Sequence, residues 1–156
     1  MRTCLALSLL LLFNSNPVAQ PVFTSIFPPE EYSARRAKLL AQIGDGVAIL
    51  QGTTERPGEQ PLRQSNQFFY LCGVIEPRAL LVIDGKAKRA TLYLSGGAER
   101  RERMFGAALK PGELAVKATG LDAVLAREEF AKTVEVFARE GRTLYTPFRA
   151  EVLGNA

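Results

Sequence analysis

The sequence predicts an α/β domain in which helices flank a mixed β-sheet. Apolar residues at helical spacing follow residue 28 and recur near the C-terminus, and short apolar runs of strand length lie between them. The expected order is helix, strand, strand, hairpin, helix, helix and strand, which is typical of a layered α/β domain. At 156 residues the chain is long enough for one domain and too short for two ordinary ones. We therefore expect a single domain over residues 28–150.

The first expected helix runs from Glu30 to Ile43 and ends at Gly44. Its apolar residues recur at near-helical spacing, and its acidic residues precede its basic ones, as the helix dipole favours. Its basic residues, Arg35, Arg36 and Lys38, are expected on a solvated face. The continuous apolar run over 47–52 then predicts a strand that is covered on both faces.

The stretch LRQSNQFFYLCG, from Leu62 to Gly73, follows a loop rich in proline and glycine. We expect a short strand over 66–73, because aromatic residues favour the pleated surface and the polar residues end at Gln67. The apolar runs 79–85 and 89–94 enclose a turn that begins with Asp84 and Gly85, and they predict a hairpin.

The rest of the chain predicts helices and one last strand. A charged helix is expected over 96–109, and a second helical region through 114–118. A stronger helix is expected from about Ala126 to Glu140, because four of its apolar residues are spaced by three and four on one face: Phe130, Val134, Phe137 and Ala138. Residues 142–148 predict a final short strand.

The first 19 residues predict a secretory signal peptide. Arg2 precedes a run of ten residues, Cys4 to Phe13, that is apolar but too short to span a bilayer, so no membrane span is expected. A buried core helix is the alternative, but the abrupt Asn, Ser and Pro residues that follow favour a signal. The protein is therefore expected to be exported, to the periplasm or the medium.

The charge pattern argues against nucleic-acid binding. The formal net charge is +4, and 20 Lys and Arg residues are interspersed with 16 Asp and Glu residues. Nucleic-acid readers usually gather basic residues on one face with aromatic residues among them. No nucleic-acid partner is expected.

The chain offers no complete catalytic or metal-binding set. It contains no histidine, and its three aspartates, Asp45, Asp84 and Asp122, include two in turns beside glycine. Cys72 lacks a histidine base, so a packed thiol is expected and a thiol enzyme is a remote alternative. Glu76 is expected to be a loop carboxylate paired with Arg78 or Arg63. We predict no catalytic residue, no metal ligand and no cofactor in this chain.

Four blocks in order carry a resemblance to a known family: RRAKLL, GDGVAILQG, RQSNQFFYLCGVIEPRALLVID and MFGAALKPG. Together they resemble the N-terminal domain of aminopeptidase P, the Xaa-Pro aminopeptidases of the creatinase and prolidase-like metallopeptidase family. The similarity covers roughly Glu30 to Pro147. Its most specific part is the aromatic core followed by Gly73, Glu76 and Pro77.

The resemblance implies a non-catalytic domain of a larger enzyme. In such enzymes this α/β domain supports homo-oligomers and overhangs the active site of a neighbouring subunit. A C-terminal or separate catalytic domain, expected outside this chain, would bind two divalent metal ions, usually manganese, and remove an N-terminal residue that precedes proline in a peptide.

The resemblance also implies a substrate-access role for Arg63, Gln67 and Met104. The family commonly has Asp at the position of Gln67 and Trp at that of Met104. Gln67 cannot ionise, and Met104 offers a smaller, flexible apolar surface. A stand-alone protein-interaction module derived from this domain is the alternative function.

Overall fold

A mixed five-stranded sheet forms the centre of the part of the chain that the computed structural model describes, residues 27–54, 62–96, 102–103 and 107–147. The strand order is β4-β3-β2-β1-β5; the β1–β2 and β2–β3 pairs are antiparallel, and the outer pairs β3–β4 and β1–β5 are parallel. The strands are β1 (Val47–Gln51), β2 (Leu80–Asp84), β3 (Arg89–Leu94), β4 (Ala123–Ala126) and β5 (Leu144–Tyr145).

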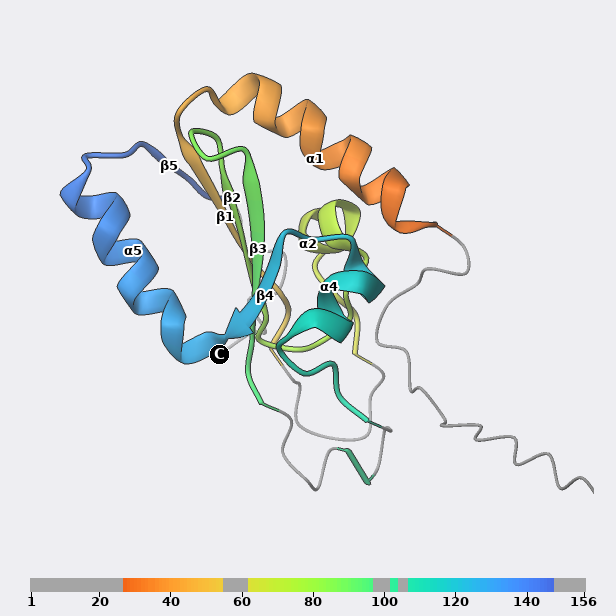
Figure 1. Cartoon of the computed structure of the whole chain (residues 1–156). Helices are drawn as coiled ribbons and strands as arrows, with labels where there is room; N and C mark the ends of the chain where they lie inside the picture. The colour runs from red at the N-terminus through yellow and green to blue at the C-terminus, as the bar shows by residue number, and fades with distance from the viewer. Residues whose placement is uncertain (1–26, 55–61, 97–101, 104–106, 148–156) are drawn as a thin grey trace, which may run out of the picture.

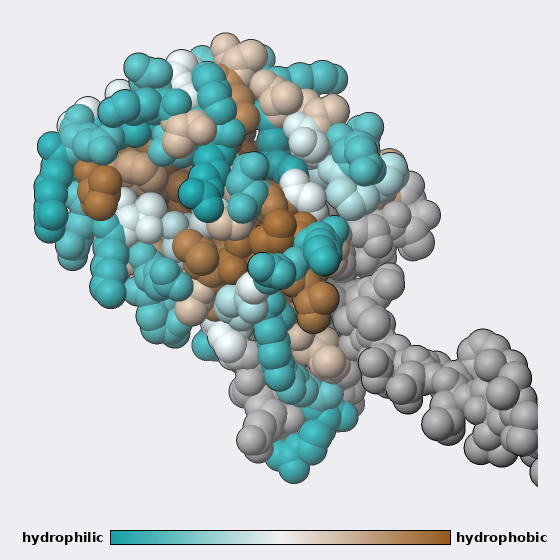
Figure 2. Space-filling view, viewed as in Figure 1, coloured by the Kyte–Doolittle hydropathy of each residue, from teal (hydrophilic) through white to brown (hydrophobic). Residues whose placement is uncertain are grey.

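Helices cover the two faces of this sheet, as the sequence predicted (Figure 1). One face carries α1 (Pro29–Ile43), α2 (Asn66–Cys72) and α4 (Glu113–Thr119), and the other carries α5 (Phe130–Arg139). The strand β1 serves both cores, because Ala48 and Leu50 pack in the cluster with α1 and α2 while Val47 packs in the cluster with α5. Apolar residues accordingly gather through the middle of the molecule, and the outer surfaces of α1 and α5 are mostly hydrophilic (Figure 2).

The expected strand over 66–73 is wrong, because these residues form the helix α2. The Ser65 side chain caps it by accepting from the backbone N–H of Phe68, and Gly73 ends it at a φ of 66°. Phe68, Leu71 and Cys72 are buried whereas Tyr70 is 53% exposed. Burial at intervals of three and four residues is a helical pattern. Two capping residues and this period therefore override the strand propensity of the aromatic side chains.

The C-terminal half also differs from the sequence prediction. The four-residue strand β4 pairs with β3 and was not predicted, and a 3₁₀ turn, Arg127–Glu129, separates it from α5. Phe137 is buried in α5, but Ala138, expected on the same inward face, is exposed. Of the charged helix expected over 96–109, residues 97–101 and 104–106 lie outside the described residues; 102–103 are helical, and 107–109 are not.

Arg36 does not lie on the solvated face expected for the basic residues of α1. It is 4% exposed, and its guanidinium donates to the carbonyl oxygens of Leu71 and Gly120, at 3.0 and 2.5 Å. Leu71 lies in the last turn of α2, and Gly120 follows the end of α4. One arginine on α1 therefore caps two other helices.

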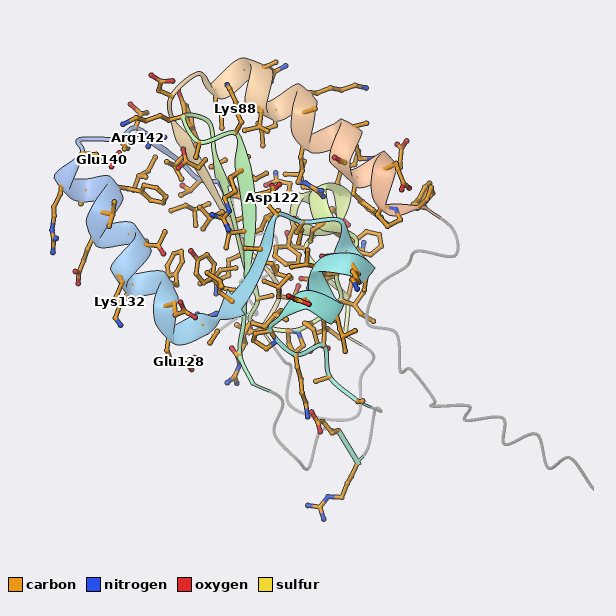
Figure 3. The ribbon with its side chains drawn as sticks, viewed as in Figure 1. Lys88, Asp122, Glu128, Lys132, Glu140 and Arg142 are labelled. Atoms are coloured by element: carbon orange, nitrogen blue, oxygen red, sulfur yellow. The ribbon has the colours of Figure 1, made fainter. Side chains whose placement is uncertain are left out.

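Arg142 joins the end of α5 to the turns at one end of the sheet (Figure 3). Its Nη2 lies 2.5 Å from Asp84 Oδ1, its Nη1 donates to Glu140, and its Nε donates to the Asp45 carbonyl. Asp84 Oδ1 also accepts from the backbone N–H of Lys86 and Ala87, as expected for an Asp in a turn. Burial alone would raise the pKa of Asp84, but the bonds from Arg142 and from Ala87 outweigh it, and the pKa is lowered.

This arrangement predicts a loss of stability in acid. A carboxyl with a depressed pKa in the folded state contributes stability above its unfolded pKa of about 4, and the contribution disappears as the pH falls through the folded pKa. Asp84→Asn keeps an oxygen for the turn but loses the charge. The urea midpoints of the original chain and this variant should differ at pH 7 and converge as the pH falls below about 4. An equal difference at every pH would contradict the role of the Asp84 charge.

Candidate functional site

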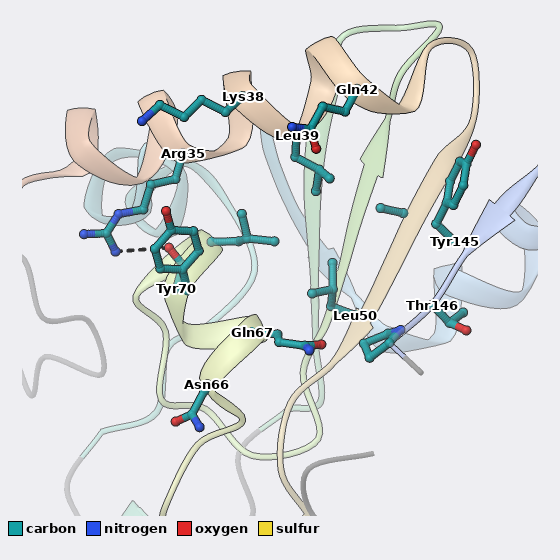
Figure 4. Close-up of a pocket in the computed structure, with 13 residues that line it drawn as sticks. Arg35, Lys38, Leu39, Gln42, Leu50, Asn66, Gln67, Tyr70, Tyr145 and Thr146 are labelled. Carbon is teal, nitrogen blue, oxygen red and sulfur yellow. Dashed lines mark hydrogen bonds between the residues drawn. The ribbon is translucent and has the colours of Figure 1, made fainter. Parts of the chain in front are cut away.

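An open groove of about 610 Å³ lies between α1, α2 and the edge of the sheet formed by β1 and β5 (Figure 4). Its floor is apolar and is formed by Leu39 of α1, Ala48 and Leu50 of β1, and Leu71 of α2. Tyr145 of β5 and Pro147 after it also line the groove. Tyr145 lies on the side away from Tyr70 and α2 (Figure 4). An apolar concavity with polar groups around it is the usual form of a binding site. We call it the α1–α2 groove.

Polar side chains surround this floor. Lys38 and Gln42 project from α1, four residues apart, and Asn66 and Gln67 project from the first turn of α2. No Asp or Glu is among the lining residues that the structure describes, and Lys38 has no ion pair there. The groove therefore presents the Lys38 charge and three exposed amides beside an apolar surface.

Arg35 also borders the groove, but its charge is already engaged. Its Nε lies 3.0 Å from Glu31 Oε1, and its Nη1 donates to the Tyr70 carbonyl at 3.2 Å. The guanidinium carbon lies 4.6 Å from the centroid of the Tyr70 ring and 5.0 Å from that of Phe27, so cation–π contacts hold it in place. Arg35 thus fixes Tyr70 against α1, and Lys38 is the cation with no partner in the described part of the groove.

A buried amide positions the start of α2 and with it Gln67. Gln64 Oε1 accepts from the backbone N–H groups of Thr53 and Ser65, at 2.6 and 2.9 Å, and its Nε2 donates to the Glu76 carbonyl at 3.1 Å. Gln64 therefore joins the residues after β1, the cap of α2 and the segment after α2. Glu76 extends this network, because it is buried and its Oε1 accepts from the Leu109 N–H at 2.8 Å. The expected pairing of Glu76 with Arg78 or Arg63 stays a prediction.

Of the three predicted access residues, the structure describes Gln67 and Arg63, and only Gln67 lines the groove. Gln67 is exposed and lines the α1–α2 groove. Arg63 is exposed but does not line it, and the Arg63 carbonyl accepts from the Thr53 hydroxyl at 2.8 Å. Met104 lies outside the described residues. The access role of these residues therefore stays a prediction.

Sequence reasoning did not single out Lys38, Gln42 or Tyr145 as site residues. The spacing of Lys38 and Gln42 places both on one face of α1 and could have suggested a shared surface. Tyr145 comes from the far end of the chain and meets them only because β5 pairs with β1 in parallel. Nothing in the sequence indicated that β5 would pair with β1.

Cys72 is a packed thiol, as expected, although it lies in a helix rather than a strand. It is 1% exposed, and its Sγ donates to the Phe68 carbonyl at 3.1 Å. Burial raises the pKa of the thiol to about 12. A thiol with this pKa carries almost no thiolate near neutral pH, which argues against a nucleophilic role.

Cys72 should therefore resist alkylation in the folded protein. In the chain from Gln20 onward it is the only cysteine. We expect iodoacetamide at pH 8 to modify it at least about a hundredfold faster in 8 M urea than in native buffer, because modification requires exposure and a thiolate. Mass spectrometry of timed samples measures both rates, and similar rates would contradict the buried environment.

Comparison with known proteins agrees with the geometry. A family model described as aminopeptidase P, N-terminal domain, matches residues 32–145, which include every element from α1 to β5 except the first turn of α1. The chain belongs to the aminopeptidase P N-terminal domain family.

Individual relatives of this aminopeptidase P domain are similar over the same region. A Coccidioides posadasii protein described as a "Probable Xaa-Pro aminopeptidase" is 32% identical over 117 residues, which are 72% of this chain and 24% of that protein. Aminopeptidase P II of Yersinia pestis is 28% identical with a TM-score of 0.58, covering 70% of this chain and 27% of that one. A zinc-substituted Escherichia coli aminopeptidase P in complex with product is 26% identical with a TM-score of 0.58, covering 68% and 26%. The chain thus spans about a quarter of the length of these relatives.

The residues present do not fit the pair of metal ions that the family resemblance implies. Within the described ranges no group of three or more His, Cys, Asp or Glu side chains is close enough together to hold an ion, and the whole chain has no histidine. No helix in the same ranges is both long and apolar enough to cross a membrane.

Proposed function

We propose that this chain is the N-terminal, non-catalytic domain of an exported Xaa-Pro aminopeptidase, and that it supports homo-oligomers and shapes access to the active site of a neighbouring subunit. The observation that carries the proposal is the family match over 32–145, together with the position of Gln67 on an open groove. The metal ions, manganese by resemblance, and the hydrolysis of peptides with proline in second position belong to a catalytic domain that joins or accompanies this one.

A chimaera tests the aminopeptidase assignment. Residues 28–147 would replace the corresponding N-terminal domain of the Coccidioides posadasii relative, and release of the first residue from an Xaa-Pro peptide would be measured with Mn²⁺. We expect no turnover by the chain from Gln20 onward alone, and turnover by the chimaera above that of the isolated catalytic part. Gln67→Asp in the chimaera restores the acid that the family commonly has at this position. A change of KM in this variant tests the access role of Gln67, and the KM of an Arg63→Ala chimaera provides the comparison. A chimaera that folds but adds nothing to the isolated catalytic part would overturn the assignment.

The α1–α2 groove supports a second candidate, a stand-alone interaction module. Its exposed amides and its Lys38 ammonium could bind a protein partner without any peptidase. The same chimaera separates the two functions, because a module that acts alone would not raise the turnover of a catalytic domain.

Export is a separate part of the proposal and rests on residues 1–19. Expression of the complete chain in a bacterial host, followed by N-terminal sequencing of the protein from the periplasm or medium, should find a start near Gln20. Full-length protein retained in the cytoplasm would count against a signal peptide.

A further inference from the structure

One exposed turn of this domain matches the α1–α2 groove in chemistry. Residues 111–114, Pro-Gly-Glu-Leu, are all exposed and form the approach and first turn of α4. Leu114 is 84% exposed, more than any other large apolar side chain in the described part of the chain. Glu113 has no ion pair within that part. We call these four residues the α4 turn.

The α1–α2 groove offers an apolar surface for Leu114 and a positive charge for Glu113. Its floor of Leu39, Leu50 and Leu71 can cover an apolar side chain, and the Lys38 ammonium beside that floor has no carboxylate partner in the described residues. Because Glu113 and Leu114 are neighbours, one short turn presents a carboxylate and an apolar side chain together. Burying an exposed leucine is favourable, and an opposite charge nearby selects the orientation.

The two features cannot meet within one chain. The groove lies at the β1–β5 edge of the sheet, whereas the α4 turn is tied to the opposite edge, because the Gly112 N–H donates to the Val124 carbonyl of β4 at 3.1 Å. The strands β3 and β2 separate β4 from β1 (Figure 1). A surface and its complement at opposite edges of one molecule favour a head-to-tail contact between copies, which closes into a ring or extends.

We propose that the α4 turn of one copy of this chain inserts into the α1–α2 groove of a second copy, with Leu114 on the apolar floor and the Glu113 carboxylate beside the Lys38 ammonium. The inference deepens the proposed oligomeric role and rests on it. It requires nothing of the catalytic domain.

Sedimentation velocity over a range of concentrations tests the contact on the chain from Gln20 onward, which retains every described residue. We expect the original chain to form species larger than a monomer as its concentration rises. Leu114→Asp and Lys38→Glu should each abolish these species. The double variant Lys38→Glu with Glu113→Lys reverses both charges of the pair and should recover them.

Two matched variants control for the changes in chemistry. Val136→Asp places the same acid at another exposed apolar position, 47% exposed on α5, and Lys132→Glu reverses another exposed lysine of α5 (Figure 3). Both lie on the helix that covers the opposite face of the sheet, so both should associate like the original chain. Circular dichroism confirms that each variant is folded.

Four results would overturn the inference, and they distinguish its failure from failure of the proposed function. If association survives Leu114→Asp, this contact is ruled out and another surface must join the copies. The same conclusion follows if the double variant fails to recover association. Loss of association in Val136→Asp as well would show that the effect is not specific to the α4 turn. A chain that stays monomeric at every concentration removes both this contact and the oligomeric role, while the chimaera assay still decides the aminopeptidase assignment.

Discussion

Replacing Gln64 by alanine is expected to lower the free energy of unfolding by about 3 kcal/mol. The side chain is 9% exposed, and one amide makes bonds to Thr53, Ser65 and Glu76, which belong to three separate segments. Alanine removes all three bonds and opens a space at the start of α2. Each buried backbone group that loses its partner costs about 1–3 kcal/mol, and partial relaxation reduces the sum.

Urea denaturation followed by circular dichroism measures this loss, and Gln67→Ala provides the matched control. Gln67 lies three residues along on α2 and is exposed, so its replacement should change the unfolding free energy by no more than about 0.5 kcal/mol. If Gln64→Ala costs as little as Gln67→Ala, the bonds of the buried amide do not order this region. In a Gln64→Ala variant that still folds, Asn66 and Gln67 should be less well ordered along the groove, because their positions depend on the cap of α2.

The strongly patterned elements of this fold could be predicted from the sequence. Acidic residues, apolar spacing and Gly44 define α1 within one residue, and Asp84 with Gly85 correctly indicates the hairpin of β2 and β3. The helix α2 was missed because aromatic residues favour strands on average. Its local signals were present, since Ser65 and Gly73 stand at its two ends, but the seven residues between them are too few for a clear period.

The site depends more on tertiary contacts, and less of it was predicted. Gln67 was identified through the family resemblance, yet the groove that it lines requires β5 to pair with β1 across about a hundred residues of chain. Whether a polar side chain of a helix points into the protein or into solvent is equally hard to predict from the sequence. Arg36 stands between Arg35 and Lys38 on α1, and nothing in the sequence distinguishes it from these two less buried residues.

Replacing Arg36 by methionine is therefore expected to be as damaging as the loss of Gln64, at about 3 kcal/mol of unfolding free energy. Burial lowers the pKa of Arg36, but a guanidinium stays protonated, so a full charge is held inside the protein. The Leu71 and Gly120 carbonyls at the ends of α2 and α4 neutralise part of its cost, because helix C-termini carry partial negative charge. Methionine keeps most of the apolar stem and removes only the group that joins the two helices.

Arg36→Lys separates the charge from the geometry of this contact. A lysine keeps the charge but has no planar fork to reach two carbonyls in different helices, so we expect it to recover less than half of the loss. Lys132→Met makes the same change of charge at an exposed position of α5, away from the proposed contact between copies, and should cost no more than about 0.5 kcal/mol. Urea midpoints of the three variants at one protein concentration provide the comparison. If Arg36→Lys is as stable as the original chain, a charge alone holds α2 and α4 to α1, and the forked double cap is not what stabilises this face of the sheet.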